Sequence, residues 1–194
     1  MDETPVIRKL DPSQLETASN ALIMGFSSDP FQRWLMPDPT IYYKNFKKWT
    51  DNTCQQSFLA EGVYGDENNY GTAVWFPPGF DIDFTHISET YKDIPKDRIE
   101  EAFKIFEELG ENRVNDAWYL EYLAVDPSKQ GLGLGSLILK ESLKVIDELG
   151  EAAYLESSNP KNMSLYERFG FRFLKKIQVG SSPQLNTMFR QPKK

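Results

Sequence analysis

Three glycines at alternate positions could bring the backbone of this chain against a phosphate group. Gly131, Gly133 and Gly135 follow a short apolar run and open a segment, beginning near Leu134, that has the apolar spacing of a helix. Glycine lets a backbone approach an anion closely because it has no side chain. The first amides of a helix have no acceptor within the helix and lie at its positive dipole end. The pattern therefore predicts a site for a pyrophosphate group.

The spacing of this loop argues against two common nucleotide-binding motifs. A Walker loop ends in Gly-Lys-Ser/Thr, but here Gly135 is followed directly by Ser136. The dinucleotide fingerprint needs its third glycine three residues after the second, and other residues stand beyond Gly135. The spacing that remains is Gln/Arg-x-x-Gly-x-Gly/Ala, filled by Gln130, Gly133 and Gly135. This loop resembles the acetyl-CoA loop of the GNAT superfamily of acyltransferases.

The residues after the loop continue the resemblance. A strand-like run covers 152–157, and a helix carrying Asn162 and Tyr166 follows it, ahead of a turn at Gly170. Alone, the glycine loop could be a turn that only lets a helix pack on a strand. In this order and at this spacing, residues 118–174 resemble the acetyl-CoA module of the GNAT superfamily. Their character is closest to the branch that contains puromycin N-acetyltransferase.

The resemblance implies one domain, 1–194, of the α/β (α+β) class. We expect a mixed, mostly antiparallel central sheet of about six to seven strands, splayed between the fourth and fifth strands and flanked by helices. Within it, 118–174 is the expected acetyl-CoA-binding core, and 81–116 is an expected helical insertion. Hydropathy patterning outside the core predicts strands over 5–10, 58–64 and 70–76, and a helix carrying Tyr42, Phe46, Trp49 and Thr53.

The resemblance also implies how acetyl-CoA, the expected co-substrate, is held. Strand 119–125 would separate from its neighbour and leave backbone amides free to pair with the pantetheine arm. Asn162 and Tyr166, four residues apart, share one face of their helix, from which Asn162 can hold the pantetheine. The full set of expected cofactor contacts is Leu123, Ala124, Val125, Gln130, Gly131, Leu132, Gly133, Leu134, Gly135, Ser136, Asn162 and Tyr166.

Two residues are expected to be catalytic. Tyr166 can protonate the departing sulfur, although a partly buried tyrosine bonded to the backbone would give the same pattern. Glu121 shares the alternating parity of Tyr119 and Leu123, so its carboxylate can reach an acceptor cavity and serve as the base. A surface carboxylate is the alternative for Glu121. Glu156, on the neighbouring strand, is the second candidate base, and water could also carry the proton away.

These features together predict an acetyltransferase. It would move the acetyl group of acetyl-CoA to a primary amine by direct attack in a ternary complex. The alternative is a non-catalytic acyl-CoA-binding sensor or interaction module, which would keep the glycine loop. Simple binding needs no acid beside the sulfur, so Tyr166 favours the enzyme.

Composition limits the partners and the location. The net charge of −7 argues against a nucleic-acid surface and suits a small-molecule amine acceptor, bound by a monomer or homodimer. The chain has no apolar run long enough for a membrane span, and its start lacks the regions of a secretory signal. Cys54 is the only cysteine, so we expect a cytoplasmic protein without disulfides. No His/Cys cluster suggests a metal, and none is expected.

Overall fold

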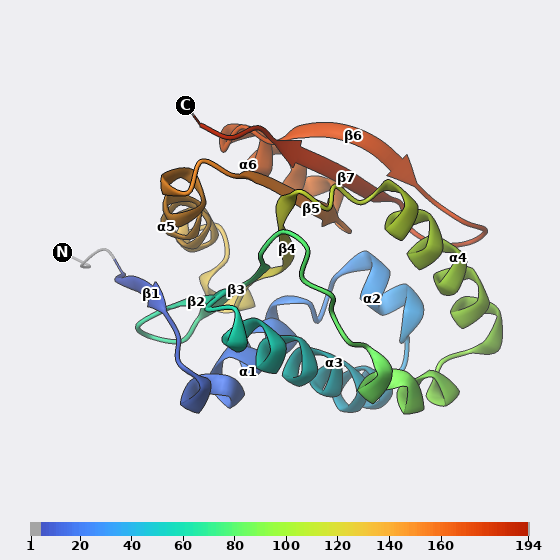
Figure 1. Cartoon of the computed structure of the whole chain (residues 1–194). Coiled ribbons are helices and arrows are strands. Elements are labelled where there is room, and N and C mark those ends of the chain that lie inside the picture. Colours follow the sequence, from blue (N-terminus) through green and yellow to red (C-terminus); the bar gives the residue numbers. More distant parts are fainter. Residues whose placement is uncertain (1–4, 194) are drawn as a thin grey trace.

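A central seven-stranded sheet organises the chain, for which the computed structural model describes residues 5–193 (Figure 1). The strands are β1 (Ile7–Lys9), β2 (Val63–Asp66), β3 (Gly71–Phe76), β4 (Ala117–Val125), β5 (Ala152–Ser157), β6 (Arg172–Ile177) and β7 (Leu185–Arg190). Their order across the sheet is β1-β2-β3-β4-β5-β7-β6, and among these strands only the pair β4–β5 is parallel. The expected mixed, mostly antiparallel sheet is confirmed.

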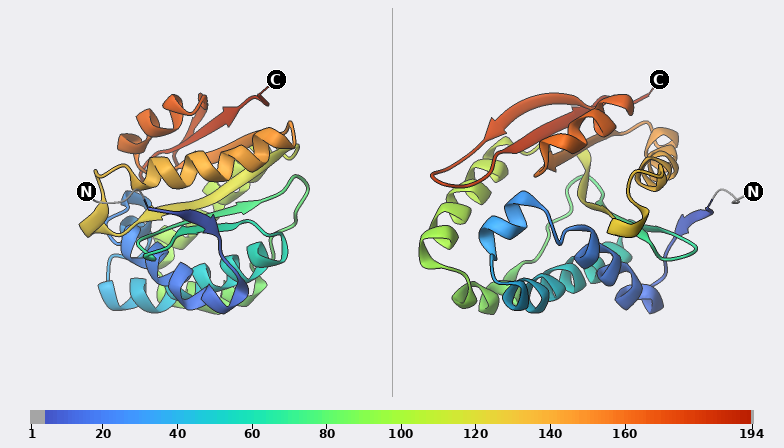
Figure 2. Two further views of the ribbon diagram at one scale, coloured as in Figure 1. Left: turned by 90° about the vertical axis from the view of Figure 1, so that its left-hand side faces the viewer. Right: turned by 180° about the vertical axis from the view of Figure 1, so that it is seen from behind.

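Helices cover both faces of the sheet (Figure 2). One face carries α1 (Leu15–Gly25), α2 (Pro30–Leu35), α3 (Pro39–Leu59) and α4 (Lys96–Asn112), and the other carries α5 (Leu134–Glu148) and α6 (Met163–Arg168). The first core, around Phe46 and Phe76, lies under α1 to α4. The second core, around Trp75 and Leu139, lies under α5 and α6. No helix within residues 5–193 combines the length and the apolar character needed to cross a membrane.

Asp-Pro and Asn-Pro pairs begin five of the helical segments. In each, the first side chain accepts a hydrogen bond from a backbone N–H of the new turn, and proline fixes the first helical φ. These residues cap α2, α3 and the 3₁₀ helices η1 (Pro12–Gln14), η3 (Pro127–Lys129) and η4 (Pro160–Asn162), and they are Asp29, Asp38, Asp11, Asp126 and Asn159. By contrast, α5 begins at Leu134, and its N-cap residue Gly133 supplies no side-chain cap. Its first amides therefore remain available for another acceptor.

The strand predicted over 58–64 is wrong in its first half. Phe58 and Leu59 belong to the last turn of α3, and β2 begins only at Val63. A short apolar run fits a helix end and a strand equally well, so the hydropathy pattern could not decide. The helix continues because Ser57 anchors its last turn to the sheet, where the hydroxyl of Ser57 donates to the Trp75 carbonyl at 2.8 Å.

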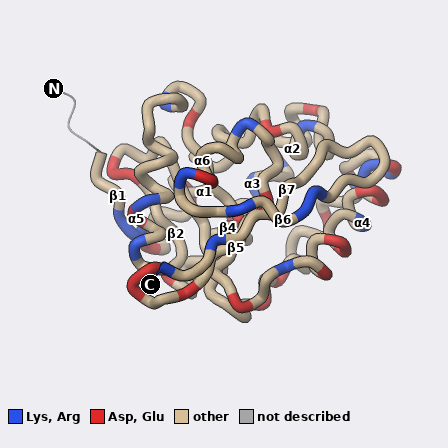
Figure 3. The backbone as a smooth tube through the Cα atoms, turned by 90° about the horizontal axis from the view of Figure 1, so that it is seen from above, with Lys and Arg blue, Asp and Glu red and all other residues tan. Residues whose placement is uncertain are grey.

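The long connection between β3 and β4 contains η2 (Thr85–Asp93) and α4. Acidic residues along α4 lie beside basic residues along β6 (Figure 3). Lys175 Nζ lies 2.8 Å from Glu108 Oε1 and joins the two elements. This contact fixes the C-terminal end of α4, which leads into Arg113, against the outer strand of the sheet.

Candidate active site

A cavity of about 850 Å³ lies where β4 and β5 separate. The two strands pair from Ala117–Ala152 as far as Leu120–Leu155 and then continue without pairing. The predicted splay between the fourth and fifth strands is therefore confirmed. The cavity has a loop end, lined by Leu123, Ala124, Val125 and the glycine loop, and a carboxylate end, lined by Tyr119, Glu121 and Glu156.

A β-bulge places Glu121 at the point of separation. On β3, Val74 pairs with Tyr122 and Trp75 pairs with Leu120, so Glu121 has no partner on that strand. The extra residue reverses the alternation of side chains along β4. Tyr119 therefore packs in the first core and Leu123 against the second. The expectation that these two side chains share one face with Glu121 is wrong, although Glu121 does line the cavity.

The glycine loop forms the other end of the cavity. Gly131 and Gly133 have φ angles of 76° and 87°, in the left-handed region that favours glycine. The side-chain amide of Gln130 donates to the Val125 carbonyl at 2.9 Å and closes the turn onto β4. Every expected cofactor contact except Leu132 lines the cavity. The side chain of Leu132 is 75% exposed, because it projects outward between two glycines in left-handed conformations.

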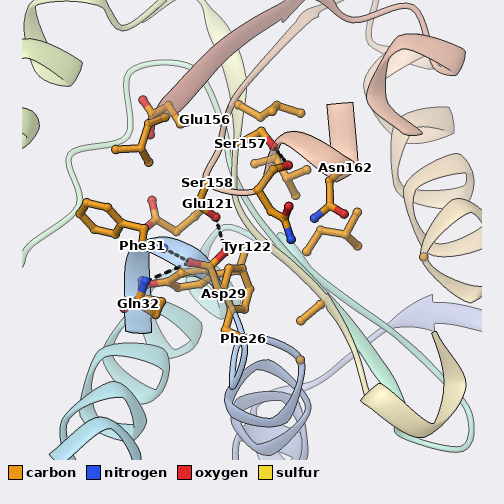
Figure 4. Close-up of a pocket in the computed structure, with 18 of the residues that line it drawn as sticks. Phe26, Asp29, Phe31, Gln32, Glu121, Tyr122, Glu156, Ser157, Ser158 and Asn162 are labelled. Atoms are coloured by element: carbon orange, nitrogen blue, oxygen red, sulfur yellow. Dashed lines mark hydrogen bonds between the residues drawn. The ribbon is translucent and has the colours of Figure 1, made fainter. Parts of the chain in front are cut away.

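Two carboxylates lie close together at the carboxylate end. The hydroxyl of Tyr119 donates to Glu156 Oε2 at 2.6 Å. Burial, and next the negative charge of Glu156, raise the pKa of Glu121 to about 7. Burial also raises the pKa of Glu156. Figure 4 shows Glu121 and Glu156 on one side of the cavity, with Asn162 on the other.

Tyr166 lines the same cavity from α6. Its ring is buried and lies edge-on to Phe171, with ring centroids 6.0 Å apart. Burial, and next the negative charge of Asp29, raise the pKa of Tyr166. Its hydroxyl therefore stays protonated across the ordinary pH range and is able to donate. The structure thus brings Tyr166, Asn162 and Glu121 to one cavity.

One known protein family matches this chain over most of its length. The sequence model of the Acetyltransferase (GNAT) family matches residues 26–171, which include β4, the glycine loop and Tyr166. This chain belongs to the GNAT acetyltransferase family. A curated relative, an uncharacterized N-acetyltransferase from Schizosaccharomyces pombe, is 34% identical over 83 residues. That alignment covers 41% of this GNAT chain and 34% of the relative, so the match spans about a third of the relative's length.

Solved structures share the fold over nearly the whole GNAT chain. The structure of histone acetyltransferase HPA2 and related acetyltransferase from Corynebacterium glutamicum aligns with a TM-score of 0.69 at 21% identity, covering 99% of this chain and 98% of that one. Arylalkylamine N-acetyltransferase 2 from Aedes aegypti aligns with a TM-score of 0.69 at 12% identity, covering 98% and 100%. At these identities the likeness concerns the fold alone.

Nothing in the sequence of this GNAT chain indicated that several further residues would line the cavity. Lys129 and Arg168 line the cavity from the loop segment and from α6. Asp29 lines it from the α1–α2 connection, and its Oδ2 accepts a hydrogen bond from the Ser158 hydroxyl at 2.5 Å (Figure 4). The Asp29-Pro30 pair signals a helix start, but nothing local indicates a partner 129 residues away. Arg113, beyond α4, completes the set at the carboxylate end.

Proposed function

We propose that this chain transfers the acetyl group of acetyl-CoA to a primary amine by direct attack in a ternary complex. The observation that carries the proposal is the continuity of the cavity. One space joins the uncapped start of α5 to the partly buried carboxylates of Glu121 and Glu156. An anionic cofactor and a cationic acceptor can therefore occupy opposite ends and meet at Glu121 and Tyr166.

The loop end fits the phosphates and the pantetheine arm of acetyl-CoA. The first amides of α5 have no side-chain cap, and Lys129 and Arg168 add positive charge to the lining. Beyond Leu120, the side of β4 that faces β5 forms no strand pairing within the described part of the chain. Backbone groups of residues 121–125 on that side can bond the amides of a pantetheine arm, because unpaired backbone groups need partners.

The carboxylate end fits the deprotonation of an amine. Glu121, with a pKa of about 7, accepts the ammonium proton, and the neutral amine then attacks the thioester carbonyl. A backbone N–H of β4 stabilises the developing oxyanion, and Tyr166 donates its proton to the departing sulfur as the carbon–sulfur bond breaks. The proton that the nitrogen loses as the amide forms then restores the Tyr166 hydroxyl. Direct attack agrees with the position of Cys54, which is buried in the first core and whose pKa burial raises to about 12.

We propose that the acceptor amine carries an apolar body. Aromatic side chains line much of the cavity, and they lie on α2 to α4, η2 and β4 or directly beside α1 and η2: Phe26, Phe31, Trp49, Phe84, Tyr91, Phe106, Tyr119 and Tyr122. Aromatic walls bind apolar groups and attract cations through their ring faces. The similarity to an arylalkylamine N-acetyltransferase and the resemblance of 118–174 to the puromycin N-acetyltransferase branch agree with such an acceptor.

Thiol release tests the proposal against the non-catalytic alternative. Purified protein is mixed with acetyl-CoA and a panel of amines, and free thiol and acetylated product are measured together. We expect release that depends on the amine, with an equal amount of N-acetylated product. A protein that binds acetyl-CoA in calorimetric titration and releases no thiol with any amine would instead be an acyl-CoA sensor or interaction module.

Gly133→Val is expected to weaken acetyl-CoA binding at least about tenfold. Gly133 is the N-cap of α5 with a φ of 87°, a conformation that β-branched residues avoid. Adjustment of the loop would turn the first amides of α5 away from the pyrophosphate. Calorimetric titration gives the Kd, and a tenfold change corresponds to about 1.4 kcal/mol.

Gly150→Val is the matched control. Gly150 also has a positive φ, 69°, but it follows the opposite end of α5 and is absent from the cavity lining. The same backbone strain there is expected to lower the unfolding temperature and leave the Kd for acetyl-CoA unchanged. Equal affinity in folded Gly133→Val and wild-type protein would remove the loop from the cofactor site.

A further inference from the structure

Arg113 places a positive charge in the wall of the cavity. Its guanidinium carbon lies 3.8 Å from the centroid of the Tyr119 ring, and the side chain is partly buried. Within residues 5–193, the guanidinium N–H groups of Arg113 make no hydrogen bond to the protein and no ion pair, and its ring contact is with Tyr119. Stacking on an aromatic face holds the guanidinium plane in place and leaves its edge free to donate. The guanidinium group of Arg113 can therefore donate hydrogen bonds to a planar group of a ligand.

Arg113 acts on the two glutamates through its charge and forms no ion pair with either of them in the described part of the chain. Its positive charge lowers the pKa of Glu121 and of Glu156, so it lies within electrostatic reach of both. Tyr119 instead contacts both a positive and a negative group. Its ring lies against the guanidinium of Arg113, and its hydroxyl lies 2.6 Å from Glu156 Oε2. The carboxylate end thus offers a cationic group beside two anionic groups.

We propose that Arg113 binds a carboxylate of the acceptor, and that the acceptor is an amino acid with an apolar side chain. Glu121 then faces the ammonium group, Arg113 the carboxylate and the aromatic lining the side chain. The guanidinium edge matches a carboxylate through two parallel hydrogen bonds. A phosphate would bring more negative charge beside Glu121 and Glu156, as would an acidic side chain. This inference rests on the proposed function, because it names the acceptor of the same site.

Three related amines measure how much a carboxylate on the acceptor contributes to kcat/KM. L-Phenylalanine carries the carboxylate, L-phenylalaninamide replaces it with a neutral amide, and phenethylamine lacks both groups. The wild-type protein is expected to have its highest kcat/KM with L-phenylalanine. In Arg113→Gln, the ratio of kcat/KM for L-phenylalanine to that for phenethylamine is expected to fall about tenfold to a hundredfold. The ratio for Arg113→Lys should lie between the ratios for the wild type and Arg113→Gln, because lysine keeps the positive charge but lacks the planar guanidinium edge.

Arg172→Gln is the control, because Arg172 is exposed on β6 and absent from the cavity lining. It should keep the wild-type ratio. An Arg113→Gln protein that loses both activities equally would overturn the inference, since Arg113 would then support the site as a whole. A wild-type preference for phenethylamine or for the amide would overturn it too.

Binding supplies a readout that does not depend on turnover. Calorimetric titration of L-phenylalanine and phenethylamine into the protein, with CoA present, is expected to show tighter binding of L-phenylalanine and loss of that advantage in Arg113→Gln. If this holds but no amine is acetylated, the proposed function fails and the carboxylate site stands. If phenethylamine is acetylated without any preference for L-phenylalanine, the proposed function stands and the carboxylate site fails.

Discussion

Tyr166→Phe is expected to lower kcat about 100-fold while leaving the Kd for acetyl-CoA near its wild-type value. The substitution removes one hydroxyl and keeps the ring, so the edge-on contact with Phe171 is preserved. A thiolate leaves more slowly when no acid protonates it, whereas binding of the cofactor does not require that proton. Steady-state kinetics with a saturating amine, combined with calorimetric titration of acetyl-CoA, measures both quantities.

Tyr43→Phe is the matched control for this hydroxyl. Tyr43 lies on α3, is 56% exposed and is absent from the cavity lining, so its variant should keep wild-type kinetics. Wild-type turnover in a folded Tyr166→Phe protein would show that Tyr166 only packs against its neighbours. A fall in acetyl-CoA affinity as large as the fall in kcat would assign Tyr166 to binding instead.

The loop end of the cavity could be predicted because its geometry is local. Strand, turn and helix are consecutive there, and Gly131 and Gly133 are required by the left-handed backbone that the turn adopts. The start of α5 near Leu134 was therefore predicted correctly. The Asp-Pro and Asn-Pro pairs at other helix starts are equally local signals, since a cap involves only the next few residues.

The carboxylate end could not be predicted in the same way, because distant segments build it. The bulge at Glu121 depends on pairing with β3, so the parity of β4 alone gave Tyr119 and Leu123 the same face. The contact between Asp29 and Ser158 joins residues that lie far apart in the chain. Likewise, the position of Arg113 depends on where α4 ends against the sheet. The residue types in the sequence indicated a candidate base, but only the folded structure showed which residues surround it.

Glu121→Gln is expected to remove the limb near pH 7 from the pH–rate profile. The pKa of Glu121 is about 7, so the wild-type kcat/KM should rise with pH up to about that value and then level off. Without the base, the reaction needs amine that is already neutral, and the rate should keep rising towards the amine pKa of about 10. The loss should be on the order of 1000-fold at pH 7 and shrink about tenfold for each further pH unit, because the neutral fraction of the amine rises tenfold per unit below its pKa.

Glu156→Gln distinguishes the two candidate bases with the same measurement. The negative charge of Glu156 raises the pKa of Glu121, so removing that charge should lower this pKa and move the limb to a lower pH. The limb itself should survive in Glu156→Gln, because the carboxylate that accepts the proton is still present. A limb that disappears in Glu156→Gln and persists in Glu121→Gln would make Glu156 the base. Unchanged profiles in both variants would show that water carries the proton, since neither carboxylate would then control the rate.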